Sequence, residues 1–490
     1  MHRRRPGFNA RTAFPYTRAR SNKTVSKPQL NFVRAVLALL SSGVGFNGAA
    51  AQADEAAPLA ALVAPCPLAE LPAETRCYSG QDDNGAWFLI AIPPQWNRGL
   101  VVHSHGGPSL DAPNARSPVA DLKRFSVVVK EGYAWAGSSY RHAGFGVRDA
   151  AEDTDNLRKL FWKAFGRPSL TLLHGQSWGA GIAVKTAELY SAARGETKPN
   201  YDGVVLTNGV LGGGSSSYDF RADLRAVYQY YCRNHPSPDD PPYPLWQGLS
   251  ADSTMTPKQL AARVNSCTGI DLPAEQRTPE QARKLRNILA VVRIPERTLQ
   301  SHLVWATFTF RDLVLRQLSG RNPFSNAGVV YSGSDDDRAL NKGVTRFTAD
   351  ADAVRLLSDD ADLSGKLPAP TLTLHAIHDP TAFIELEDSF RQVVNAAGAQ
   401  ANLVQVFTDR DEHQTLSNPE YAAAFQAMRN WLETASRPGP AAVADLCRTK
   451  LKTYGESCRI VPGYVLPSLS KRVPARSKPG LNQADASTSK

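Results

Sequence analysis

The chain has 490 residues and a formal net charge of +10, a value that raises the question of a nucleic-acid partner. Nine of its 56 Lys and Arg residues lie within residues 1–53, which contain no Asp or Glu, so the remaining 47 basic residues nearly balance 46 acidic ones. The excess charge therefore belongs to a leader, and the composition argues against a nucleic-acid partner.

Residues 1–53 are the first predicted element. They combine a basic start, an apolar stretch over residues 32–46 and small residues that end in Ala51-Gln52-Ala53, the layout of a secretory signal peptide. The apolar stretch is too short and too rich in Gly and Ser to span a bilayer, so we expect no stable membrane anchor. The prediction is an exported protein, either periplasmic or secreted.

Six cysteines follow the leader. An even number in an exported chain favours disulfides over metal ligands. Several connectivities are possible, and the simplest joins neighbours in sequence: Cys66 with Cys77, Cys232 with Cys267, and Cys447 with Cys458. Each bond closes a short loop and would stabilise the fold by about 2–4 kcal/mol through restriction of the unfolded chain.

Short apolar runs alternate with helical patterns from residue 86 onward. The runs are bounded by Gly, Pro or Asn, as strands are, and they occupy residues 87–92, 99–105, 133–139, 170–174 and 202–208. Apolar residues at three- and four-residue spacing predict helices over 149–165 and 179–193. This alternation predicts a mostly parallel sheet flanked by helices on both faces, with residues 54–214 as the first part of an α/β core.

The pattern changes after Gly214. Thr256 and Thr278 each precede Pro, with Gln two residues further on, which is a start signal for a helix. Residues 215–365 are therefore predicted to be a helical cap insertion. Strand patterns return over 370–380 and 402–408, so residues 366–458 complete the core, and the Pro-, Ser- and Lys-rich residues 459–490 are predicted to be a disordered tail.

Ser177 lies in Gly175-Gln176-Ser177-Trp178-Gly179, which matches the pattern G-x-S-x-G. A predicted strand precedes it and a predicted helix follows. In a nucleophile elbow a strained turn between strand and helix raises the Ser Oγ above the sheet, and the glycines let the flanking backbones approach closely. We therefore predict that Ser177 is a nucleophile; the alternative is a Gly-Ser turn without chemistry.

A nucleophilic serine needs backbone donors for the oxyanion that it creates. One donor is the N–H of Trp178, the residue after the nucleophile, and the second comes from a loop after an earlier strand. That loop is His105-Gly106-Gly107-Pro108, and we assign the second donor to Gly107 or, failing that, to Gly106.

The serine also needs a base and an acid that orients the base. In hydrolases built on such an elbow these residues follow the serine in the order acid, then His. His413 is the last histidine of the chain and the only one after His378, so we predict that it is the base. Asp379, at the end of the strand pattern 370–380, is the best candidate for the acid. The alternatives are that His413 is a surface histidine and that Asp379 is a helix cap.

Other histidines allow a metal site to be drawn, with His103-x-His105 and His375-x-x-His378 as ligands. These residues are accounted for by the strands that hold them, and an acidic ligand has no clear partner. We expect no metal and no other cofactor.

Together these residues resemble the α/β-hydrolase superfamily over roughly residues 86–214 and 366–435. The pairing of H-G-G-P with G-x-S-W-G is most similar to the proline iminopeptidase branch and related secreted esterases. The resemblance implies an α/β-hydrolase fold with a cap inserted between its sixth and seventh strands. It also implies a Ser-His-Asp triad that works through an acyl-enzyme.

The expected activity is hydrolysis of a carboxylic ester, on a small-molecule or polymeric substrate held between the sheet and the cap. Trp305, Phe308 and Phe310 are expected to supply apolar surface to the substrate, or else to form the core of the cap. The alternatives are a serine peptidase of the aminopeptidase type and a hydrolase fold that binds without catalysis.

Overall fold

The protein is described here by a computed structural model that covers residues 62–64, 66, 68–192 and 198–479. Within these residues nine strands form one sheet in the order β1-β2-β3-β5-β4-β6-β7-β8-β9. The pairs from β1 to β5 are antiparallel, and the pairs from β5 to β9 are parallel. The strands are β1 (Leu62–Ala64), β2 (Arg76–Gln81), β3 (Trp87–Ile92), β4 (Gly99–Ser104), β5 (Ala134–Ser138), β6 (Leu170–Gln176), β7 (Gly203–Thr207), β8 (Thr371–Ala376) and β9 (Leu403–Thr408).

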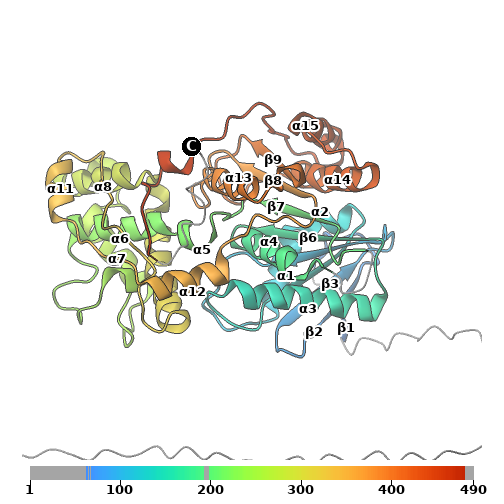
Figure 1. Ribbon diagram of the computed structural model, residues 1–490, viewed down its shortest axis with the longest axis horizontal. Helices are drawn as coiled ribbons and strands as arrows, with labels where there is room; N and C mark the ends of the chain where they lie inside the picture. The colour runs from blue at the N-terminus through green and yellow to red at the C-terminus, as the bar shows by residue number, and fades with distance from the viewer. Residues whose placement is uncertain (1–61, 65, 67, 193–197, 480–490) are drawn as a thin grey trace, which may run out of the picture. The chain divides into compact units, whose positions relative to one another are not determined.

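Helices cover both faces of this sheet, as Figure 1 shows. Val102 and Leu173 pack on one face against α3 and α4, while their strand neighbours Val101 and Leu172 pack on the other face with α2 and α14. Strands buried on both faces explain the continuous apolar runs of the sequence. The helices of this part are α1 (Arg116–Arg124), α2 (Ser126–Lys130), α3 (Val147–Phe165), α4 (Trp178–Tyr190), α13 (Leu386–Ala396), α14 (Asn418–Thr434), α15 (Pro440–Thr449) and α16 (Leu451–Tyr454).

The segment between β7 and β8 is helical throughout its regular structure, as predicted; we call α5 to α12 the inserted helices. Thr256 and Thr278 form the predicted capping boxes at the starts of α7 and α8. Helices α9 and α10 are followed by π-helical turns at Trp305–Thr309 and Leu313–Gln317. The inserted helices are α5 (Gly213–Ser216), α6 (Asp219–Cys232), α7 (Pro257–Thr268), α8 (Pro279–Val292), α9 (Leu299–Val304), α10 (Phe310–Asp312), α11 (Asp337–Gly343) and α12 (Ala351–Ala361).

The strand order and the placement of the insertion define an α/β-hydrolase fold. A parallel sheet with an antiparallel start and a strand–serine–helix turn at β6 and α4 is the arrangement that the G-x-S-x-G motif requires. Strands β1 and β2 were not predicted from the sequence. Because β1 adds a strand at the edge, the insertion that was expected after the sixth strand follows β7.

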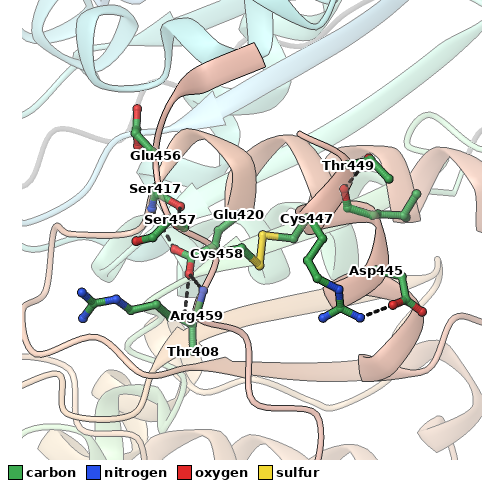
Figure 2. Close-up of a disulfide and its surroundings, with 12 residues drawn as sticks. Thr408, Ser417, Glu420, Asp445, Cys447, Thr449, Glu456, Ser457, Cys458 and Arg459 are labelled. Atoms are coloured by element: carbon green, nitrogen blue, oxygen red, sulfur yellow. Dashed lines mark hydrogen bonds and ion pairs between the residues drawn. A yellow bond between two sulfur atoms is a disulfide. The ribbon is translucent and has the colours of Figure 1, made fainter. Parts of the chain in front are cut away.

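All three predicted disulfides form: Cys66–Cys77, Cys232–Cys267 and Cys447–Cys458. The last joins α15 to the segment after α16, beside the buried carboxylate of Glu420 (Figure 2). Glu420 accepts hydrogen bonds from Thr408 Oγ1 at 2.6 Å and from the backbone N–H of Arg459 at 3.0 Å. The chain after the disulfide is therefore tied to β9.

The C-terminal segment differs from the disordered tail that was predicted over 459–490. Ile460 forms a β-bridge with Thr408. Further on, the side chains of Arg476 and Lys478 are only 4% and 3% exposed, and they form ion pairs with α6. The basic residues that indicated a solvated tail are partners of acidic side chains on the inserted helices, a pairing across more than two hundred residues that local composition cannot reveal. Residues 480–490 and the leader predicted over 1–53 lie outside the described residues. No helix in the described ranges is long and apolar enough to cross a membrane.

Candidate active site

Ser177 occupies a strained turn between β6 and α4. Its backbone has φ 59° and ψ −127°, a left-handed conformation that costs a non-glycine residue energy. A Cβ at Gly175 would collide with the carbonyl of Gly179, and a Cβ at Gly179 would collide with the carbonyl of Ser104. Both glycines of the motif are therefore needed for close backbone packing, as the sequence pattern predicts.

The loop after β4 lies directly against this turn. A Cβ at Gly106 would sit 2.9 Å from the carbonyl oxygen of Gln176, so only glycine fits there. The hydroxyl of Tyr140 donates to the carbonyl of His105 at 3.0 Å and holds the start of the loop. Trp178 is the first residue of α4, where backbone N–H groups have no partner within the helix. The two predicted oxyanion donors thus come from adjoining segments.

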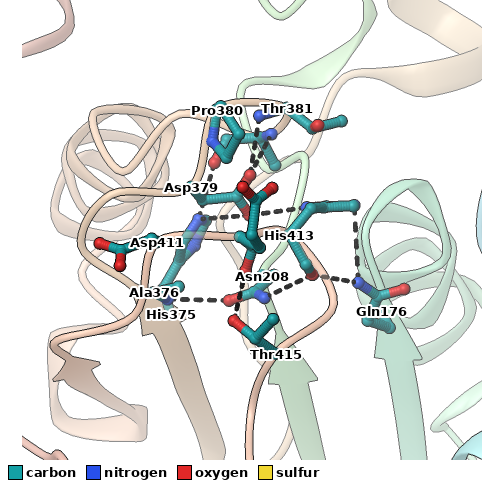
Figure 3. Close-up of polar contacts among 12 residues, drawn as sticks. Gln176, Asn208, His375, Ala376, Asp379, Pro380, Thr381, Asp411, His413 and Thr415 are labelled. Atoms are coloured by element: carbon teal, nitrogen blue, oxygen red, sulfur yellow. Dashed lines mark hydrogen bonds and ion pairs between the residues drawn. The ribbon is translucent and has the colours of Figure 1, made fainter. Parts of the chain in front are cut away.

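Asp379 and His413 meet beyond the ends of β8 and β9. The Nδ1 atom of His413 lies 2.6 Å from Oδ2 of Asp379 (Figure 3). The other carboxylate oxygen of Asp379 accepts the backbone N–H groups of Thr381 at 2.8 Å and Ala382 at 3.0 Å. A carboxylate that accepts all three bonds is fixed in position, and it holds the imidazole with its Nε2 free of the proton.

Two amide side chains that the sequence analysis missed fix the backbone of His413. Asn208, at the end of β7, donates to the carbonyl of His413 at 2.7 Å, and Gln176 donates to the same oxygen at 3.1 Å. The Oδ1 atom of Asn208 accepts the backbone N–H of Ala376 at 2.8 Å, so it also ties β7 to β8. The position of Gln176 inside the G-x-S-x-G motif was the one signal in the sequence for this role.

A buried ion pair lies behind Asp379. Nδ1 of His375 is 3.0 Å from the carboxylate of Glu387, and its Nε2 is 2.8 Å from the carbonyl of Ala382. Both partners only accept hydrogen bonds, so both ring nitrogens must carry protons. Burial alone would lower the pKa of His375, but the hydrogen bond and the charge of Glu387 raise it overall. The Nε2 atom of the resulting imidazolium lies 3.7 Å from Oδ2 of Asp379.

Most of the predicted site residues line one cavity of about 520 Å³: Gly106, Gly107, Ser177, Trp178, Trp305 and His413. Asp379 lies behind His413. Among the described residues no hydrogen bond joins Ser177 to His413, whose Nε2 is 3.5 Å from Nε2 of Gln176. Hydrogen bonds of catalytic residues are often long or misaligned without substrate.

Phe308 and Phe310 take the second of the two places expected for them, the core of the cap. Phe310 is fully buried and stacks on Phe324, and Phe308 packs against the same core of the inserted helices. Neither lines the cavity. The π-helical turns shift the side chains after Trp305 away from the direction that a regular α-helix would give them.

The histidines that allowed a metal site to be drawn have other partners. His103 lies 2.9 Å from His174, and His105 lies 2.6 Å from the buried carboxylate of Asp121. His378 is exposed and pairs with Asp409 at 3.2 Å, whereas His375 is buried.

No protein family matches the chain in a scan of family models, and no curated protein matches its sequence. Solved structures similar to it include an esterase from Aspergillus oryzae, which is 14% identical, with 74% of this chain and 81% of that chain covered and a TM-score of 0.37. Candida antarctica lipase A is 12% identical, with 82% and 86% covered and a TM-score of 0.38. A rice cell wall degrading esterase from Xanthomonas oryzae is 12% identical, with 78% and 90% covered and a TM-score of 0.33. The assignment of the fold rests on the strand order and the serine turn.

Proposed function

We propose that this protein is an exported serine hydrolase that cleaves carboxylic esters. The observation that supports it most is the pairing of two fixed elements at one cavity. Ser177 stands in a strained turn between strand and helix, and His413, held by Asp379 at 2.6 Å, lines the same cavity. A serine on a strained turn next to an oriented imidazole is suited to covalent acyl transfer.

In the proposed reaction His413 Nε2 takes the proton of Ser177 as Oγ attacks the ester carbonyl. The N–H groups of Trp178 and Gly107 donate to the oxyanion of the tetrahedral intermediate. His413 then gives its proton to the departing alkoxide, which leaves the acyl group on Ser177. Water, deprotonated by His413, attacks this acyl-enzyme; the acid leaves and the proton returns to the serine.

The test is covalent labelling with a fluorophosphonate, followed by mass spectrometry of the modified peptide. We expect one adduct on Ser177, and hydrolysis of short-chain p-nitrophenyl esters that Ser177→Ala abolishes. Ser436→Ala, at an exposed serine after α14, is the matched control and should label and turn over normally. Turnover of prolyl or other aminoacyl amides without ester turnover would favour a peptidase instead. A chain that takes no label and cleaves no ester would be a binding protein.

Export is supported by the three disulfides and by the composition of the leader. Amino-terminal sequencing of the mature protein checks it. We expect the mature protein to begin directly after Ala53. An uncleaved chain that retains residues 1–53 and stays in the cytosol would contradict export.

A further inference from the structure

Arg221 is a buried cation that faces the candidate active site. It lies on α6, is only 5% exposed, and lines the same cavity as Ser177 and His413. Arginine is almost never buried to this degree unless it is paired. Its surroundings therefore need an explanation.

No carboxylate pairs with Arg221 within the described residues, and its buried Nε has no hydrogen-bond acceptor. Two acidic residues lie close to it on the same helix, but both are already paired. Asp219 binds Lys478 at 2.6 Å, and Asp223 binds Arg476 at 2.6 Å. The acids of α6 are thus partners of the C-terminal segment, and the guanidinium of Arg221 is left without a counter-charge.

Aromatic rings hold Arg221 in place instead. Its guanidinium carbon lies 4.4 Å from the ring centre of Trp305 and 4.5 Å from that of Phe220. Tyr218 stacks on Trp305, with the two ring centres 4.5 Å apart, and its own ring centre lies 5.9 Å from the guanidinium carbon of Arg221. Burial lowers the pKa of Arg221 to about 10, so the side chain is still charged at neutral pH. Contacts between a cation and aromatic faces offset only part of the cost of burying a charge.

A second guanidinium, that of Arg124 from α1, lines the same cavity, and its Nη2 is buried without a hydrogen-bond partner. Among the described residues that line the cavity, the one carboxylate belongs to Asp121, and its Oδ2 lies 2.6 Å from Nδ1 of His105. The charges that remain available to a bound molecule are therefore positive.

Another buried arginine of α6 shows what distinguishes Arg221. Arg225 is fully buried one turn further along the helix, where it donates to the carbonyl of Gly248 at 3.2 Å. It is not among the residues that line the catalytic cavity. Both arginines are therefore buried, and Arg221 differs from Arg225 because it lines the cavity.

We propose that the substrate is an ester that carries a carboxylate, and that Arg221 binds this carboxylate. The inference rests on the proposed ester hydrolase function. A planar guanidinium offers paired N–H donors that match the two oxygens of a carboxylate, and the flanking rings hold it ready for that contact. Arg124 adds positive potential that draws the anion into the cavity.

The test compares matched esters with and without a free carboxylate on the mature protein. With the charge on the acyl side, the pair is 4-nitrophenyl hydrogen adipate and 4-nitrophenyl methyl adipate. With the charge on the leaving group, the pair is 4-acetoxybenzoate and 4-acetoxybenzamide. Their hydrolysis is measured as the release of acetate. In one of the two pairs we expect kcat/KM to be roughly 10- to 100-fold higher for the anion, as a charge-assisted contact predicts.

Arg221→Met should bring that ratio close to one, and Arg221→Lys should restore part of it. The ratio is measured within one preparation, so a smaller amount of folded protein cancels. Arg355→Gln removes a half-exposed charge on α12, outside the cavity, and should leave the ratio unchanged. Adipate should also slow fluorophosphonate labelling of the wild type more than inorganic phosphate does at equal ionic strength.

The inference is overturned if, in both pairs, the wild type cleaves the neutral ester with the same kcat/KM as the anionic one, whatever the variants do. It is overturned too if Arg221→Met keeps the preference, or if phosphate protects Ser177 better than adipate. Each of these results leaves the proposed ester hydrolase intact, because Ser177 is then still labelled and esters are still cleaved. Absence of labelling and of ester turnover would instead remove the proposed function itself.

Discussion

The carboxyl edge of the sheet and helix α6 of the inserted helices differ in how they surround a buried charged side chain that lies near the cavity. Around the catalytic candidates at the sheet edge, buried groups pair with each other: Asp379 with His413 and Glu387 with His375. On α6 of the inserted helices, Arg221 has aromatic rings around it and, among the residues that the structure describes, no carboxylate partner. In the proposed function the paired groups act on the ester bond of any substrate, and in the further inference the unpaired Arg221 selects which substrate binds.

The largest expected effect comes from Ser177→Ala at the sheet edge. Without the hydroxyl no acyl-enzyme forms, and we expect kcat to fall by about 10⁴- to 10⁶-fold. The comparison requires the fall to be equal for anionic and neutral esters, because the serine acts after selection. Steady-state kinetics on both esters measure this, and an unequal loss would mean that the two regions do not divide their roles in this way.

Asp379→Asn comes next. The amide keeps the size of the side chain but loses the charge, and its NH₂ group opposes the N–H of His413, so the imidazole adopts the wrong tautomer. A loss of about 10⁴-fold in kcat is expected, with KM little changed. Stopped assays over a range of ester concentrations, with active-site titration of the enzyme, measure kcat and KM. A loss below tenfold would show that Asp379 does not orient the base.

Arg476→Met tests the pairing of α6 with the C-terminal segment. Arg476 binds Asp223 at 2.6 Å, and its removal leaves a buried carboxylate without its main partner. Breaking a buried pair from one side costs about 3–5 kcal/mol in the free energy of unfolding. Urea unfolding measures this, with Arg355→Gln as the exposed control, which should change stability by less than about 0.5 kcal/mol. Equal effects of the two substitutions would mean that the tail is not anchored.

The sheet edge was predictable because local rules determine it. Turn geometry demands the glycines around Ser177, and strand ends place Asp379 and His413, so short stretches of sequence contain the signal. The glycine loop before Pro108 was predictable for the same reason. Asn208 was not, because one asparagine after a strand has many possible roles, and its contact with His413 exists only once β7, β8 and β9 lie side by side.

The inserted helices were predictable as helices but not in their roles. Capping residues identify α7 and α8 locally, whereas the acids and arginines of α6 look like ordinary charge pairs along a helix. The partners of these acids are Arg476 and Lys478, which are far away in sequence. Strands β1 and β2 lie at one end of the sheet and were not predicted. Strand β2 is largely half-exposed and mixes polar with apolar residues, which weakens the apolar signal of a strand.

The smallest expected effect comes from a substitution in the inserted helices that changes no charge. Thr278 caps α8 and accepts the backbone N–H of Gln281 at 3.2 Å, remote from the catalytic cavity. Thr278→Ala should cost about 1 kcal/mol of unfolding free energy, because one backbone donor at the helix start loses its acceptor. Thr453→Ala, at an exposed threonine of α16, should cost less than about 0.5 kcal/mol. Both variants should keep the wild-type ratio of anionic to neutral ester hydrolysis, since neither changes a charge at the cavity. If Thr278→Ala altered this ratio, substrate selection would depend on the stability of the inserted helices as a whole, and Arg221 would no longer be sufficient to explain it.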